Sequence, residues 1–235
     1  MGILTTSLHR FYLAAQRRHP EVLYQGEGVG RRVALTFDDG PHPQDTLPLL
    51  AVLGRHQVRA TFHLVGKSVE QYAELVRNIH QEGHQLALHC YRHVPFPLED
   101  PAALHAGLVR SQNAIASAAG ISPTSIRDLR PPYGIFTSRT RSQLMEWGFR
   151  LVMWSCIPPH WMQPVVWSIR QVMEAVVPGA VIVLHDGHGH GKRVAEIVDA
   201  IVPQIQSLGF EFVTVEEMQV QQSQVNHPEQ NQGKV

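Results

Sequence analysis

The stretch from Val33 to Pro41 constrains the fold of this chain most, because a run of apolar residues ends there in two adjacent carboxylates and a Gly-Pro pair. A short apolar run bounded by turn residues is typical of a buried strand of a parallel sheet, which becomes polar only where it emerges. Asp38 and Asp39 repel each other at such an exit. A cation or a reacting proton beside them would offset this repulsion, whereas a helix N-cap or a turn would explain the same pair as plain structure.

Length and charge exclude several classes of protein. A chain of 235 residues with 43% hydrophobic content can bury one sizeable core. Lys and Arg together number 20, as do Asp and Glu, so we expect no nucleic acid as the main partner. We find no apolar run long enough to span a membrane and no signal peptide in residues 1–20, so the sequence as written reads as cytoplasmic, and the compartment stays open. The sequence leaves the oligomeric state open.

Seven apolar segments predict seven strands, at 33–37, 59–65, 85–89, 126–129, 149–154, 179–184 and 210–215. Helical spacing of apolar residues separates them, and such alternation is typical of a parallel sheet with right-handed crossovers. We therefore expect an α/β fold with one domain at 32–218. Residues 1–31 form an irregular lead-in, and the Gln-rich, polar residues 219–235 are expected to be a disordered tail.

Helix ends are marked by capping residues. Asp45 or Thr46 is expected to cap a helix that runs to residue 56. Apolar residues at helical spacing over 69–79 predict one further helix. Asp100 before a proline predicts another helix start, and Gly120 predicts its end.

Polar residues with chemically useful side chains cluster just after the predicted strands. Asp38 and Asp39 follow the first strand, His89 and His93 the third, Arg130 the fourth, His160 and Trp161 the fifth, and His185 and Asp186 the sixth. A seven-stranded parallel sheet is either open or closed into a barrel. In a barrel these loops converge on one face, where the active sites of such folds lie, so the clustering favours the barrel.

His89 and His93 are the strongest metal-ligand candidates. Two imidazoles four residues apart, joined by a carboxylate such as Asp39, form a three-ligand set that leaves a position open for water. An HxxxH pair alone is a weak motif in a chain with 15 histidines. Cys90, between the two histidines, is either a thiolate ligand or nucleophile or a small residue that fills a gap, and the second role is the commoner one.

Four ordered segments resemble the motifs of the polysaccharide deacetylases with a NodB-homology domain. The resemblance covers about residues 32–218. The matching segments are 36–40 (TFDDG), 83–93 (from Gly-His to the second His of the pair), 130–134 (RPPYG) and 184–186 (LHD). Cys90 replaces the Ser or Thr that is usual in the second motif. The resemblance implies a distorted (β/α)7 barrel with parallel strands.

The resemblance also implies a role for each matching residue. The implied metal ligands are Asp39, His89 and His93, around one divalent ion, expected to be zinc. The implied catalytic residues are Asp38 as base, Arg130 as its partner and His185 as general acid. The implied substrate contacts are the backbone amide of Tyr133 facing the oxyanion, Trp161 as a pocket wall and Leu184 in the acetyl pocket.

The fourth motif departs from the family pattern. Where the family has Asp, two residues, Asp and Trp, this chain has Ile157, two prolines, His160 and Trp161. The second acid supports the general-acid histidine in the family. The loss of both acids therefore puts in doubt the catalytic rate or the choice of substrate, but neither the fold nor the metal site.

The resemblance implies hydrolysis of the N-acetyl amide of a GlcNAc-containing sugar polymer or oligomer, with release of acetate. Two alternatives stay open. One is a metal-dependent amidase acting on a small amide, and the other is a weakly active or non-catalytic carbohydrate-binding member of the family. The sequence does not identify the polymer.

Overall fold

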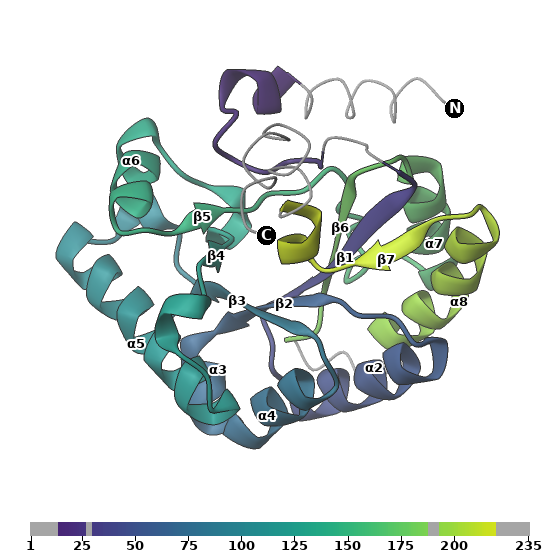
Figure 1. Ribbon diagram of the computed structural model, residues 1–235, viewed down its shortest axis with the longest axis horizontal. Helices are drawn as coiled ribbons and strands as arrows, with labels where there is room; N and C mark the ends of the chain where they lie inside the picture. Colours follow the sequence, from purple (N-terminus) through teal and green to yellow (C-terminus); the bar gives the residue numbers. More distant parts are fainter. Residues whose placement is uncertain (1–13, 27–29, 188–192, 220–235) are drawn as a thin grey trace, which may run out of the picture.

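The structure, a computed structural model, describes residues 14–26, 30–187 and 193–219, where strands and helices alternate around a central sheet (Figure 1). The strands are β1 (Arg32–Asp38), β2 (Thr61–Val65), β3 (Gln85–Cys90), β4 (Asp128–Leu129), β5 (Arg150–Leu151), β6 (Ala180–His185) and β7 (Glu211–Val213). The helices are α2 (Pro43–His56), α3 (Gly66–Gln71), α4 (Ala73–Gln81), α5 (Pro101–Ala119), α6 (Ser138–Glu146), α7 (Val165–Ala175) and α8 (Arg193–Ser207). Short 3-10 turns are η1 (Phe96–Leu98), η2 (Pro123–Ser125) and η3 (Pro132–Gly134).

All strand pairs among the described residues are parallel, and the strand order is β5-β4-β3-β2-β1-β6. β7 pairs with the first half of β1, at Arg32–Ala34, while β2 pairs with the second half, from Thr36 to Asp38. Two strands, β7 and then β2, thus pair with successive halves of the same edge of β1. A parallel bridge between Cys156 and Ile182 links the segment after β5 to β6, so the sheet curls toward closure. The predicted seven-stranded, distorted (β/α)7 barrel in one domain is confirmed.

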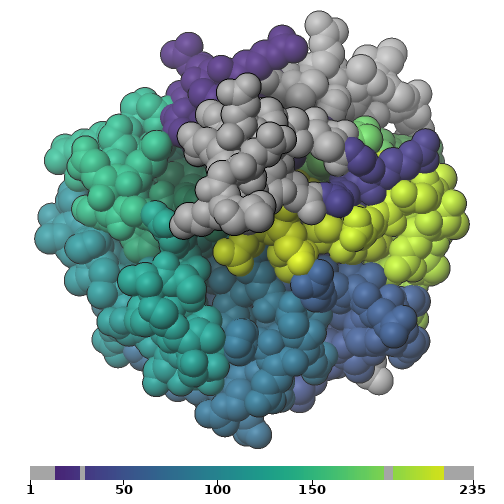
Figure 2. Space-filling view, viewed as in Figure 1, coloured from purple at the N-terminus to yellow at the C-terminus, as the bar shows by residue number. Residues whose placement is uncertain are grey.

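The segment ahead of β1 covers the outer edge of the sheet beside β5. Leu23 forms a parallel bridge with Val152 just after β5, and Gly26 N–H donates to the carbonyl of Gly179 just before β6, at 2.9 Å. Val22, Leu23 and Tyr24 are buried. Part of the predicted lead-in therefore contributes to the core. The start of β1 and the late strand β7 lie side by side, purple beside yellow, on the face seen in Figure 2. The predicted tail lies outside the described residues, apart from Gln219.

Two predicted helices differ from the structure, and one agrees. His42, not Asp45 or Thr46, caps α2, because Pro43 provides a preorganised first residue and the His42 ring accepts from the Gln44 amide. The expected single helix over 69–79 is two helices, α3 and α4, broken at Tyr72. Asp100 caps α5 as expected, and Gly120 ends it in the left-handed conformation.

Strands β4 and β5 contain only two residues each, fewer than predicted. Part of the reason lies in the Arg130 side chain, which donates hydrogen bonds to the carbonyls of Val152 and Met153. Because these carbonyls accept from a side chain, they do not extend the backbone hydrogen bonds of β5. Within the described ranges, no helix combines the length and the apolar character needed to cross a membrane.

Candidate active site

A cavity of about 470 Å³ opens at the carboxyl ends of the strands. Its lining comes from several strand ends and the loops that follow them, and consists of Asp38, Asp39, His89, His93, Pro131, Tyr133, Gly134, Trp154, Ile157, Trp161 and His185. Most of the predicted site residues therefore meet in one place. Arg130 and Leu184 are the exceptions, because both are fully buried and neither lines the cavity. Leu184 packs in the hydrophobic core.

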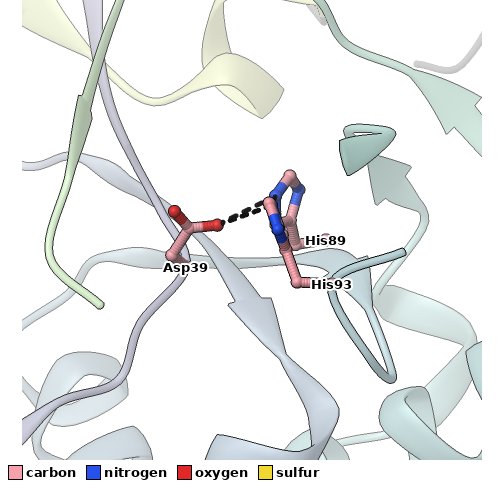
Figure 3. Close-up of side chains that lie close together, drawn as sticks. All are labelled: Asp39, His89 and His93. Atoms are coloured by element: carbon pink, nitrogen blue, oxygen red, sulfur yellow. Dashed lines mark hydrogen bonds and ion pairs between the residues drawn. The ribbon is translucent and has the colours of Figure 1, made fainter. Parts of the chain in front are cut away.

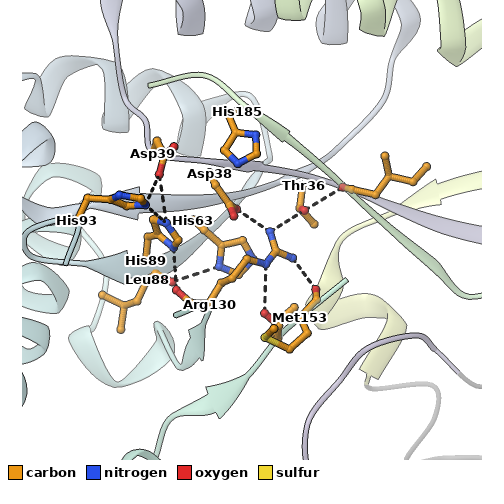
Figure 4. A network of polar contacts seen from close by, with 12 residues as sticks. Thr36, Asp38, Asp39, His63, Leu88, His89, His93, Arg130, Met153 and His185 are labelled. Atoms are coloured by element: carbon orange, nitrogen blue, oxygen red, sulfur yellow. Dashed lines mark hydrogen bonds and ion pairs between the residues drawn. The ribbon is translucent and has the colours of Figure 1, made fainter. Parts of the chain in front are cut away.

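The two carboxylates at the end of β1 serve different neighbours. Asp38 points to Arg130, whereas Asp39 points to His89 and His93 (Figure 4). Asp39 has a φ of 74°, a left-handed conformation that is uncommon outside glycine but more accessible to Asp than to most residues. Gly187 lies so close that a Cβ there would overlap the Asp39 carbonyl group. The backbone turn at Asp39 and the tight contact at Gly187 together fix the Asp39 carboxylate.

Asp39, His89 and His93 bring three ligand atoms together (Figure 3). Asp39 Oδ1 lies 3.1 Å from Nε2 of His89 and 3.1 Å from Nε2 of His93, and the two ring nitrogens are also 3.1 Å apart. Neighbouring ligand atoms around a tetrahedral zinc with bonds of about 2.0–2.1 Å are about 3.3 Å apart. The three atoms are therefore spaced as a three-ligand set for one such ion.

The contacts of His89 also suit a metal ligand. Its Nδ1 lies 2.7 Å from the carbonyl oxygen of Arg130 and must donate there, because a carbonyl oxygen only accepts. In the neutral ring Nε2 then carries the lone pair that a metal needs. Burial opposes protonation of His89, but the hydrogen bond that the ring donates to Asp39 and the nearby charges of Asp38 and Asp39 outweigh it and raise the pKa of the ring. The site favours positive charge, as a cation-binding site should.

Arg130 is fully buried and uses its guanidinium group to connect three strands (Figure 4). Its NH1 group donates to Asp38 Oδ1 at 2.6 Å and to Thr36 Oγ1 at 2.8 Å. The other nitrogens donate to the carbonyls of Val152 and Met153, at 3.1 and 2.9 Å. Burial lowers the pKa of Arg130, and the charge of Asp38 opposes that shift. Arg130 thus holds Asp38 in place while Asp38 still faces the cavity.

Aromatic rings form another part of the cavity lining. Tyr133 lies in η3 with a φ of 58°, and its ring meets His93 edge-on at 4.5 Å between centroids. Trp161 meets the ring of His185 edge-on at 4.7 Å. Trp154 and Ile157 add further apolar surface. The cavity is therefore apolar except where the acids and histidines point into it.

His160, at the position where the fourth motif has its second acid, lies against His185. Its Nε2 accepts from the His185 backbone N–H at 2.9 Å and lies 3.2 Å from His185 Nδ1. Ile157, at the position of the first acid, lines the cavity. The altered motif therefore occupies the expected place beside the predicted general acid.

Several supporting residues were not identified from the sequence. Thr36 lies two positions before Asp38, so both face the same side of β1, and this alternation could have revealed it. His63 is buried and donates to the carbonyl of Leu88 at 3.2 Å, and burial lowers its pKa well below the usual value. The contact of His63 with Leu88 is a tertiary contact, which no local sequence signal reveals.

Cys90, which the sequence analysis left with two possible roles, is buried. Burial raises the pKa of its thiol well above that of a free thiol, which favours the gap-filling role.

Asp186 lies behind the loop that carries Asp39. Thr46 Oγ1 accepts from the His42 amide and donates to Asp186 Oδ2 at 2.5 Å, while the Asp186 amide donates to the Asp38 carbonyl at 3.0 Å. Burial raises the pKa of Asp186 to about 7. Asp186 thus connects the end of β6 to the start of α2 and to the end of β1.

At its carboxyl edge the parallel barrel carries an Asp-His-His cluster that could hold a metal ion and, beside it, a buried Asp-Arg pair. A family model described as polysaccharide deacetylase matches residues 25–152. A peptidoglycan-N-acetylglucosamine deacetylase, PgdA, of Listeria monocytogenes is 30% identical over 223 residues, which are 94% of this chain and 46% of that protein. A chitooligosaccharide deacetylase of a Bradyrhizobium strain is 36% identical over 195 residues, 77% of this chain and 88% of that protein.

Solved structures agree with the sequence relatives. A peptidoglycan N-acetylglucosamine deacetylase structure superposes with a TM-score of 0.80 at 30% identity, over 84% of this chain and 92% of that one. Bacillus subtilis PdaA, at 22% identity and a TM-score of 0.78 over 92% of this chain and 88% of that one, shares the fold. The chain belongs to the polysaccharide deacetylase family, as its motifs predict. The predicted class, a hydrolase of carbon-nitrogen bonds, is that of this family. The chain spans about half the length of the Listeria relatives.

Proposed function

We propose that this protein hydrolyses the N-acetyl amide of a GlcNAc-containing glycan and releases acetate and a free amine. The observation that carries the proposal is the joint presence, in one cavity, of the Asp39-His89-His93 cluster and of Asp38 paired with Arg130. Relatives named for deacetylation of peptidoglycan and of chitooligosaccharides support the same substrate class.

Asp39, His89 and His93 would hold one divalent ion, for which zinc suits the two imidazoles and one carboxylate. When bound, such an ion lowers the pKa of a water molecule and polarises a carbonyl group. The remaining steps belong to the protein. Asp38, with Oδ1 bonded to Arg130, takes the proton of the attacking water as general base.

On the opposite side of the amide, His185 would protonate the departing nitrogen. The Tyr133 backbone amide would donate to the oxygen of the acetyl carbonyl, where negative charge develops during attack. The rings of Tyr133 and Trp161 offer apolar surface against which a sugar ring can pack. A contact between Leu184 and the acetyl group stays a prediction. Leu184 is buried in the hydrophobic core and does not line the cavity, so the acetyl group would have to reach it there.

A test of the proposal is acetate release from GlcNAc oligomers, peptidoglycan fragments and small amides. The protein is assayed as purified, after removal of metal by a chelator, and after zinc is returned. We expect release from acetylated sugars, loss with the chelator and recovery with zinc. The Asp38→Asn variant is the matched control for contaminating activity. Release from small amides alone would favour the amidase alternative, and sugar binding without acetate would favour a non-catalytic member of the family.

A further inference from the structure

The inner neighbour of His185 is another histidine. His160 is almost fully buried, at 2% exposure, and is not part of the cavity lining, whereas His185 faces the cavity. The two rings lie 5.3 Å apart between centroids. His160 therefore touches the predicted general acid from the protein side and has no direct place against a substrate.

Hydrogen-bond chemistry fixes which atoms carry hydrogen in this pair. The backbone N–H of His185 can only donate, so His160 Nε2, at 2.9 Å, must present its lone pair. A neutral His160 then carries its hydrogen on Nδ1. The same Nε2 lies 3.2 Å from His185 Nδ1. Two facing lone pairs would repel, so this contact favours a hydrogen on His185 Nδ1, which then shares the single Nε2 lone pair with the backbone N–H. With its hydrogen on Nδ1, the neutral His185 ring carries its lone pair on Nε2.

His160 is itself anchored. Its carbonyl accepts from Arg193 of α8 at 3.1 Å, and its amide donates to the Pro158 carbonyl at 2.7 Å. Trp161 meets the rings of both histidines edge-on, at 5.4 Å from His160 and 4.7 Å from His185. The ring of His160 is therefore held in one orientation, as a residue that positions another must be.

We propose that His160 is a positioning residue: its uncharged Nε2 sets the tautomer and orientation of His185, so that His185 Nε2 faces the substrate. The proposal rests on the proposed function and adds to it a role for the altered fourth motif. A carboxylate at this place would accept the same hydrogen and add a negative charge. An imidazole supplies the acceptor without the charge, so the substitution preserves the geometry of the general acid.

The decisive experiment is 15N NMR of the histidine rings in the unsubstituted protein, at a pH where His185 is neutral. We expect His185 to be protonated on Nδ1 and bare on Nε2, and His160 to be bare on Nε2. His185 protonated on Nε2, or His160 protonated there, would overturn the proposal. This measurement needs neither activity nor a variant. If no glycan releases acetate, the proposed function fails, and the spectrum still decides the role of His160.

Two variants extend the test to turnover. His160→Phe keeps a planar ring but has no acceptor, so we expect His185 to lose its fixed tautomer and kcat to fall by about tenfold or more, with KM and metal content little changed. His160→Asp restores an acceptor and should keep the Nδ1-protonated form. His105→Phe, on α5, is the matched control and should leave kcat and the His185 tautomer as they are. An unchanged tautomer and kcat in His160→Phe would refute the positioning role.

Discussion

Asp38 and Arg130 form an ion pair with 2.6 Å between Oδ1 and NH1, and neither side chain is more than 4% exposed. Loss of one partner leaves the other charge buried without compensation. We predict that Arg130→Met lowers the free energy of unfolding by about 3–5 kcal/mol, as measured by urea denaturation. The exposed pair of Arg170 and Glu174 provides the control, since Arg170→Met should cost no more than about 0.5 kcal/mol. Equal, small losses in both variants would contradict the prediction.

Asp38→Asn is predicted to remove the general base while the metal cluster stays intact. An amide can still accept from Arg130 but cannot take a proton from water, so turnover should fall by about a hundredfold or more. Metal content and the unfolding midpoint are measured on the same sample. Asp199→Asn, at an exposed acid on α8, serves as the control. Near-normal turnover in Asp38→Asn would assign the base elsewhere.

Metal binding is predicted to depend on all three clustered side chains. Elemental analysis of the purified protein should find close to one divalent ion per chain, and His89→Ala, His93→Ala and Asp39→Ala should each reduce it strongly. His80→Ala, which removes a histidine from α4, should keep the full content. Undiminished metal in the three cluster variants would mean that the ion binds at another place.

Gly187→Ala is predicted to weaken metal binding without changing any ligand. A Cβ at Gly187 would overlap the Asp39 carbonyl group and must displace the loop that holds the carboxylate. The metal dissociation constant should rise about tenfold or more, in the range seen when groups around a ligand are disturbed. Gly54→Ala is the matched control, because its Cβ would meet no atom closer than 4.0 Å. Equal affinities in the two variants would show that the loop adapts.

Asp186 gives the stability of the protein a predicted pH dependence. Its pKa is raised from 3.8 to about 7, so the folded state binds the proton more tightly than the unfolded state. This contribution is fully present below about pH 3.8 and is lost as pH rises through about 7. Over the full range the shift corresponds to at most about 4 kcal/mol.

The comparison with Asp186→Asn isolates this contribution, because the amide keeps an acceptor for Thr46 and does not titrate. Unfolding free energies of both proteins are measured from pH 5 to pH 8. The unsubstituted protein should lose stability relative to the variant as pH rises toward 7, and the difference should level off above about pH 7. A constant difference across the series would mean that Asp186 does not titrate in this range.

The sequence predicted the strand exits well because each exit combines a local signal, an apolar run, with an abrupt polar end. Asp38, Asp39, His89 and His93 were found in this way, and the structure brings them together in one cavity. The start of α2 was misplaced because the proline at residue 43 outweighed the usual acidic caps.

Features set by long-range contacts could not be read from local patterns. The placement of β7 beside the first half of β1 depends on how much of that edge β2 leaves unoccupied. The atoms through which His160 meets His185 were equally hidden, because this contact joins residues 25 positions apart through the fold. The sequence placed both histidines near the site but gave no information on which atoms would meet.

The segment from Leu23 to Gly26 has a consequence for the order in which the chain folds. Gln25 donates to the carbonyl of Pro178, 153 residues later, so this contact forms only after most of the chain exists. During synthesis Gln25 therefore lacks this partner until Pro178 has been made. The edge beside β5 that Leu23 pairs with is likewise uncovered until the segment docks. Contacts of such sequence separation slow folding. Docking of this segment is thus expected to come late in the assembly of the barrel.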